Sequence, residues 1–117
     1  MSLNFPDCIS AFMDSKVSFF FTGDFYNTAS NKNTIIQLKK DGHYLGPHSN
    51  KHLLYADWNK RDSLLVTKQE FIKDLQLNYA AMKKFGIINA RYFMPPYEWY
   101  NDTIAAWTKD LKLQLIN

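Results

Sequence analysis

Short apolar runs alternate along this chain with longer segments in which apolar residues recur every three or four positions. Runs of four to eight residues rich in aromatic and β-branched side chains are typical of buried strands. The first such run, VSFFFT, is closed by Gly23. Strands are therefore predicted at residues 17–22, 44–46, 91–94 and 111–116.

The segments between these runs have helical periodicity and helix-terminating residues. Thr67 stands three residues before Glu70, the spacing of a capping box in which each side chain accepts a backbone N–H at the helix start. Gly42 and Gly86 stand where helices commonly end. Helices are predicted at residues 5–15, 33–41, 67–85 and 101–108.

An alternation of strands and helices at this spacing is typical of right-handed βαβ units and a parallel sheet. The sequences FFFTG, GPHSNKH and FMPPYEWY each begin where a predicted strand ends. Because parallel α/β folds build their sites at the carboxyl ends of strands, we expect these three loops to lie on one rim and to form a site.

Composition narrows the functional classes without choosing one. The 117 residues suffice for a single domain with a buried core. The net charge of +3 comes from scattered Lys and Arg, a pattern that does not favour nucleic acid as a partner. Cys8 is the only cysteine, which excludes a disulfide framework, and no apolar run is long enough for a membrane span.

His48 and His52 are the side chains with the clearest chemistry. Imidazole is a common zinc ligand, and a spacing of four places both rings on one face of a helical turn. Ser49 occupies the position where a zincin motif needs Glu, so that class is excluded. A zinc site also needs a third protein ligand. From spacing alone, two loop histidines satisfied by hydrogen bonds remain the alternative.

Three motifs in this order resemble the polysaccharide deacetylases, the NodB-homology domain of carbohydrate esterase family 4. GHYLGPHSNKH is similar to the family's second signature, in which a His-(Ser/Thr)-x-x-His pattern follows a Gly-His-x-x-Gly sequence. KVSFFFTGDF resembles the strand upstream of it, and RYFMPPYEWY resembles the third signature, Arg-x-Pro-(Tyr/Phe)-Gly. The resemblance extends from about residue 5 to the end of the chain.

The resemblance implies an α/β fold that is an incomplete, deformed (β/α) barrel with parallel strands, a fragment of a seven-stranded barrel. It implies hydrolysis of acetyl groups on a polysaccharide or oligosaccharide. His48 and His52 match the family's ligands to a divalent metal, with zinc favoured, and Ser49 would support their loop. The backbone N–H of Tyr97 matches the oxyanion donor, and an extracytoplasmic or cell-envelope location is implied.

The chain also departs from the family pattern. The first signature, Thr-Phe-Asp-Asp, which supplies the base and the third metal ligand, is not found in the sequence. Residues 1–117 are therefore expected to be the central part of the domain, without its first strand and C-terminal part, and inactive alone. Met94 and Glu98 replace the Arg and Gly of the third signature, and Glu98 is interpreted either as a site carboxylate or as an exposed loop residue.

The third loop, residues 93–100 (FMPPYEWY), is rich in aromatic residues. Its composition favours contact with sugar, since flat rings can stack on the apolar face of a pyranose. These candidate substrate-binding residues are Pro96, Tyr97, Trp99 and Tyr100, and Trp58 invites the same interpretation. Packing beneath the loop is the alternative for the aromatic rings.

Two rival functions remain. One is a non-catalytic carbohydrate-binding module on the same fold, favoured by Met94 and by the missing aspartates. The other is a metal-free interaction module. Because a partial barrel leaves strand edges unpaired, a homo-oligomer formed through those edges is a further expectation.

Overall fold

The computed structural model describes residues 16–117. Its elements, in chain order, are β1 (Ser18–Phe21), α2 (Gly23–Asn27), η1 (Ala29–Asn31), α3 (Lys32–Lys40), β2 (Tyr44–Pro47), α4 (Lys68–Lys83), β3 (Tyr92–Phe93), η2 (Pro96–Glu98), α5 (Asp102–Asp110) and β4 (Gln114–Leu115). The four strands and the helices that separate them confirm the predicted alternation. The helix predicted at residues 5–15 lies outside the described residues.

The strands pair in parallel, as the alternation predicts. β1 pairs with β2, with Ser18 opposite Tyr44, and β3 pairs with β4, with Tyr92 opposite Gln114. Among residues 16–117 these parallel pairs form two separate two-stranded sheets.

A side chain explains why β2 and β3 do not form a regular ladder. The Tyr44 hydroxyl accepts the N–H of Tyr92 at 2.9 Å and donates to the carbonyl of the same residue at 2.9 Å. The backbone groups of Tyr92 are thus satisfied by a side chain of β2. Further along, the N–H of Met94 donates to the carbonyl of Pro47 at 3.3 Å and keeps the two strands side by side.

The starts of α2, α4 and α5 are capped by side chains. Thr67 and Glu70 form the predicted capping box at the start of α4, and the Asn101 side chain accepts the N–H of Ile104 at 3.0 Å at the start of α5. The short helix α2, capped by Thr22, was not predicted. Five residues are too few to show helical periodicity, and the helix begins at Gly23, the residue that was expected to close the strand.

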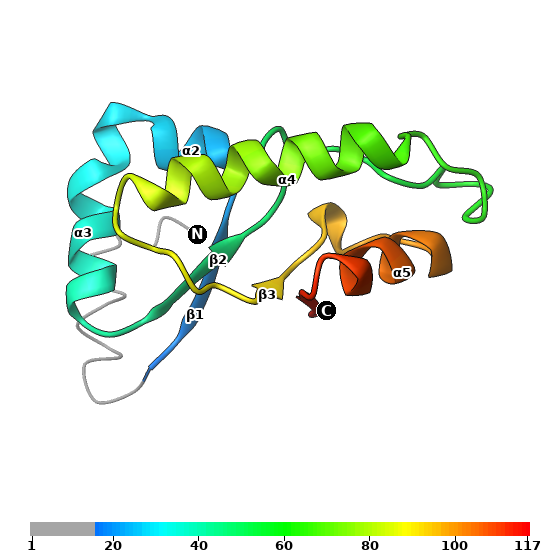
Figure 1. The fold of residues 1–117 in the computed structure, drawn as a ribbon. Coiled ribbons are helices and arrows are strands. Elements are labelled where there is room, and N and C mark those ends of the chain that lie inside the picture. The colour runs from blue at the N-terminus through cyan, green and yellow to red at the C-terminus, as the bar shows by residue number, and fades with distance from the viewer. Residues whose placement is uncertain (1–15) are drawn as a thin grey trace.

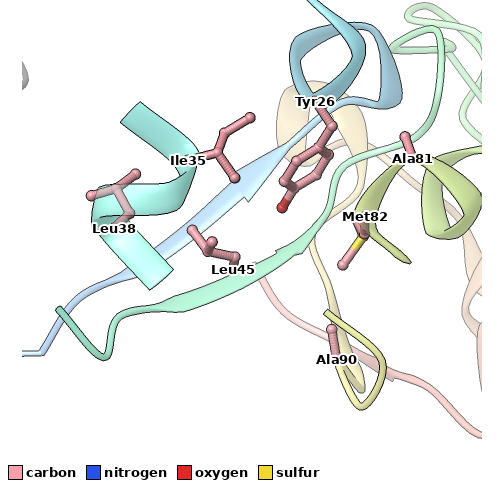
Figure 2. Close-up of a cluster of buried hydrophobic side chains, with 7 residues drawn as sticks. All are labelled: Tyr26, Ile35, Leu38, Leu45, Ala81, Met82 and Ala90. Carbon is pink, nitrogen blue, oxygen red and sulfur yellow. The ribbon is translucent and has the colours of Figure 1, made fainter. Parts of the chain in front are cut away.

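Two hydrophobic clusters form the core, and α4 contributes to both. Figure 2 shows the first cluster, in which side chains of α2, α3 and α4 converge on Leu45 of β2. The second cluster contains Phe71 and Leu75 from the first half of α4, together with Phe93 of β3 and Ile104 of α5. In Figure 1, α4 accordingly extends from the β1–β2 pair at the left to α5 at the right.

None of the helices within residues 16–117 is both long enough and apolar enough to cross a membrane.

Candidate metal centre

The loops that follow β1 and β2 are joined by backbone hydrogen bonds. The N–H of Gly23 donates to the carbonyl of Ser49, and the N–H of Asp24 donates to the carbonyl of Asn50, both at 3.2 Å. A Cβ on Gly23 would lie 1.8 Å from Asn50 Oδ1 and 3.2 Å from Asn50 Cα, so a larger residue here would displace the Asn50 side chain. Gly23, the first residue of α2, therefore leaves room for the Asn50 side chain.

His48 directly follows β2 and reaches the third loop. Its Nδ1 lies 2.6 Å from the carbonyl oxygen of Met94. A carbonyl can only accept, so Nδ1 carries the proton and the Nε2 lone pair remains available. A hydrogen bond of this kind orients metal-binding histidines in proteins. The three loops predicted to share a rim therefore do meet around His48.

His52 lies beside His48, but not through a helical turn. The two ring centroids are 4.8 Å apart and the rings meet edge to face. Ser49 and His52 have φ values of 71° and 55°, so the segment is an irregular loop with two residues in the left-handed region. The prediction that both rings lie on one helical face is wrong. The irregular path of the loop brings the two rings together. Left-handed residues other than glycine are strained, and such strain is common at functional sites.

A buried carboxylate holds this loop on α4. Asp74 Oδ2 accepts the Ser49 hydroxyl at 2.5 Å and the N–H of Asn50 at 2.8 Å, and its Oδ1 accepts the N–H of Lys51 at 3.2 Å. The Ser49 oxygen in turn accepts the N–H of Leu53 at 3.1 Å. Ser49 is fully buried and Asp74 is 7% exposed, so these bonds are shielded from water.

One turn further along α4, Asn78 fixes the start of the same loop. Its Oδ1 accepts the N–H of His48 at 2.9 Å, while its Nδ2 donates to the carbonyl of Phe21 in β1. Sequence reasoning missed both Asp74 and Asn78. The available signal was a pair of polar residues, four apart, on the helix face that also carries Phe71 and Leu75.

The third loop presents Tyr97 to the histidines. The Tyr97 ring lies 4.5 Å from that of His52, edge to face, and its side chain is 54% exposed. Tyr97 and Glu98 have φ values of 62° and 52°. The position at which the deacetylase signature has Gly is therefore left-handed here, and Glu98 occupies it with a side chain that disfavours this conformation.

The other candidate substrate residues lie farther from the histidine pair. Pro96 is buried beneath the loop. Trp99 packs against Trp58, with ring centroids 5.4 Å apart, and the Tyr100 ring lies 5.5 Å from the Arg61 guanidinium carbon. The structure thus brings together His48, His52 and Tyr97, and places Trp99 and Tyr100 in an adjoining aromatic group.

Imidazole nitrogens are common ligands of divalent metals, so His48 and His52 would be the residues of this loop to hold such an ion. The fixed tautomer of His48 and the adjacent ring of His52 are the features that such a site requires. Within residues 16–117, however, no group of three His, Cys, Asp or Glu residues lies close enough to hold a metal ion. The described residues by themselves therefore do not contain a complete ligand set.

Burial lowers the pKa of His48 below its ordinary value of 6.5, and His52 adds to this shift, whereas the Met94 carbonyl and Glu98 oppose it. The neutral ring is therefore favoured in the folded chain. Its stabilising contribution is complete above about pH 6.5 and is lost as the pH falls through the lower, folded-state pKa.

We expect His48→Gln to show a smaller loss of stability than the unmodified chain between about pH 7.5 and about pH 5.5. The measurement is the urea concentration at half-unfolding at each pH, followed by circular dichroism. Equal losses in the two proteins would show that burial of His48 does not contribute to the pH dependence.

Comparisons with known proteins bear on the family and on the fold. The profile of the polysaccharide deacetylase family matches residues 11–116. No relative was found among curated protein sequences. Similar solved structures include a CE4 family pseudoenzyme from Bacillus anthracis, with 18% identity and a TM-score of 0.79 over 96% of this chain. A family 4 carbohydrate esterase from Streptomyces lividans, in complex with acetate, has 16% identity and a TM-score of 0.73 over 96% of this chain.

A peptidoglycan deacetylase from Bacillus subtilis has 19% identity and a TM-score of 0.70 over 97% of this chain. The chain covers 37% of the B. anthracis protein, 54% of the S. lividans esterase and 49% of the B. subtilis enzyme. At these identities the solved structures establish a shared fold. The family profile extends over nearly all of the sequence, from before β1 to the end of β4, and on that ground the chain belongs to the polysaccharide deacetylase family.

Proposed function

We propose that this chain carries the metal-binding loop of a deacetylase that removes acetyl groups from a carbohydrate, with His48 and His52 as two ligands of a divalent metal. The observation that carries the proposal is the hydrogen bond from His48 Nδ1 to the Met94 carbonyl, which leaves Nε2 free to bind beside the His52 ring. Zinc is the favoured ion because it binds imidazole readily.

When bound, such a metal polarises the acetyl carbonyl and lowers the pKa of a coordinated water. The residues of this chain orient the site. Asp74 and Asn78 hold the loop on α4, and Ser49 links Asp74 to the turn that carries His52. We assign the backbone N–H of Tyr97 as a hydrogen-bond donor to the oxyanion formed on the acetyl group.

The wider architecture is part of the same proposal. We infer that the two parallel pairs belong to a deformed (β/α) barrel, which would place the loops after β1, β2 and β3 around one mouth. The parallel registers and the hydrogen bonds between the loops support this arrangement. The remaining metal ligand and the catalytic base are assigned to residues other than 16–117, because these contain no complete ligand set.

A second candidate function is carbohydrate binding without catalysis. It is favoured by Met94, which stands where the deacetylase signature has an Arg, and by the incomplete ligand set of the described residues. One of the similar structures is a pseudoenzyme, and a mutant of it is described as having restored enzymatic activity. The fold is thus compatible with either outcome.

Acetate release separates the two functions. The full-length natural protein is incubated with N-acetylchitotetraose and with an acetylated xylo-oligosaccharide, with added Zn²⁺ and then with a chelator. We expect acetate release that the chelator stops and that His48→Ala lowers by more than about 100-fold. If glycan binds without acetate release, the non-catalytic function is favoured. If acetate release is unchanged in His48→Ala, the proposal is wrong.

A further inference from the structure

The segment between His52 and α4 contains a hydrogen-bonded hairpin, which we call the 57–63 loop. Its base is an antiparallel bridge between Ala56 and Leu64, and the N–H of Asp57 donates to the carbonyl of Ser63 at 3.0 Å. Asp57 Oδ2 also accepts the N–H groups of Asn59 and Lys60, each at 2.9 Å. In Figure 1 this turn is the green loop that projects at the far right, beyond the start of α4.

Trp58 of this loop continues the row of rings that begins at the histidines. Its ring centroid is 5.2 Å from that of Tyr97, and the Tyr97 centroid is in turn 4.5 Å from that of His52. Trp58 is 52% exposed and Tyr97 is 54% exposed. Two large aromatic side chains therefore offer open surface directly beside the candidate metal centre.

Arg61 packs against two further rings of this aromatic group, those of Trp99 and Tyr100. Its guanidinium lies 4.4 Å from the ring centroid of Trp99 and 5.5 Å from that of Tyr100, and its Nε donates to the Tyr100 carbonyl at 2.6 Å. The indole N–H of Trp99 donates to the carbonyl of Asp57 at 3.3 Å. Trp99 thus contacts both Arg61 and Trp58, and the 57–63 loop is tied to the third loop.

We propose that Trp58 and Tyr97 form a stacking platform for the pyranose ring next to the sugar unit whose acetyl group reaches His48 and His52, with Arg61 as a positioning residue. This inference rests on the proposed function. A pyranose presents a face of C–H groups that matches an exposed aromatic ring, and its hydroxyls need polar groups at the rim.

The occupant follows from the size and place of the platform. Two exposed rings are far smaller than a stable protein interface requires. They adjoin the histidine pair through Tyr97, and their rim carries the polar groups of the 57–63 loop. A glycan that extends from the metal centre satisfies both conditions.

The test is a titration of the chain with N-acetylchitotetraose and xylotetraose, in the presence of a chelator, followed by NMR. We expect Trp58→Ala to weaken the binding of at least one oligosaccharide by about three- to tenfold, and Trp58→Phe to retain most of the affinity. Tyr92→Ala is the matched control, since this half-exposed ring packs against Tyr44 and not against the 57–63 loop.

Arg61 is tested by its effect on the indoles. Arg61→Ala should weaken oligosaccharide binding and change the near-UV circular dichroism of the tryptophans, and Arg61→Lys should restore part of both. An arginine that only stabilises the fold would change neither spectrum nor affinity while the chain stays folded.

The inference is overturned if neither oligosaccharide binds to the unmodified chain, or if Trp58→Ala binds both as tightly as the unmodified chain. Because the titrations contain a chelator, these outcomes leave the metal site untouched. Failure of the proposed function is recognised separately, by metal binding that does not depend on His48.

Discussion

Replacing His48 and His52 together with alanine should remove specific Zn²⁺ binding from this chain. The loss of an outer-shell partner typically lowers metal affinity by roughly 10–100-fold, and the loss of direct ligands should cost more. His48 should be the more sensitive single position, because its Nε2 is held ready by the bond to Met94. Isothermal titration with Zn²⁺ measures the affinity of the unmodified chain and of each variant.

His43 supplies the matched control. It is the one histidine of the sequence outside the pair, and it is 8% exposed. Its Nδ1 accepts the N–H of Val17 at 3.0 Å. In His43→Asn the side-chain oxygen can accept the same bond, so the fold is kept while an imidazole is removed. Zinc affinity should be unchanged. A loss of affinity equal to that of His48→Ala would show that the ion does not select the His48–His52 pair.

The second large effect is expected at Asp74. Asp74→Asn keeps the shape of the side chain but removes the charge and one of the two acceptor oxygens. The buried donors on Ser49 and Asn50 and the half-buried N–H of Lys51 cannot then all be satisfied. We expect the free energy of unfolding to fall by about 2–4 kcal/mol, the cost of leaving buried donors without charge-assisted partners. Urea denaturation measures this change.

Asp110→Asn is the control for the loss of an aspartate. Asp110 forms an exposed ion pair with Lys68 at 3.2 Å. Such pairs contribute little, so the change should be below about 1 kcal/mol. Equal costs at the two positions would contradict the role given to Asp74. Zinc affinity should also fall in Asp74→Asn, because the loop that positions His52 is no longer fixed to α4.

The helices whose ends are fixed by capping residues close in the sequence are the ones that sequence patterns predict. Thr67 with Glu70, and Asn101, fix the starts of α4 and α5 through bonds within a few residues of each other. Gly42 and Gly86 have φ values of 83° and 76°, the conformation expected just beyond a helix. These features depend on local spacing, which is visible in a single chain.

The sheet and the site depend on partners that are distant in the sequence. The Tyr44 hydroxyl forms hydrogen bonds with both backbone groups of Tyr92, forty-eight residues away. These bonds take the place of a ladder between the two strand pairs. Asp74 and Asn78 look like ordinary polar helix positions in the sequence, because their partners at residues 48–51 belong to a distant loop. The pairing of His48 with His52 was predicted, but its left-handed loop could not be read from a spacing of four.

The most direct test of a metal held by His48 and His52 is a crystal structure of the zinc-loaded chain with anomalous scattering measured at the zinc edge. The account predicts a single strong anomalous peak about 2.0–2.1 Å from His48 Nε2 and from a ring nitrogen of His52, with the Nδ1 contact to Met94 retained. An anomalous peak elsewhere on the chain, or none beside His48 at saturating zinc, would contradict it.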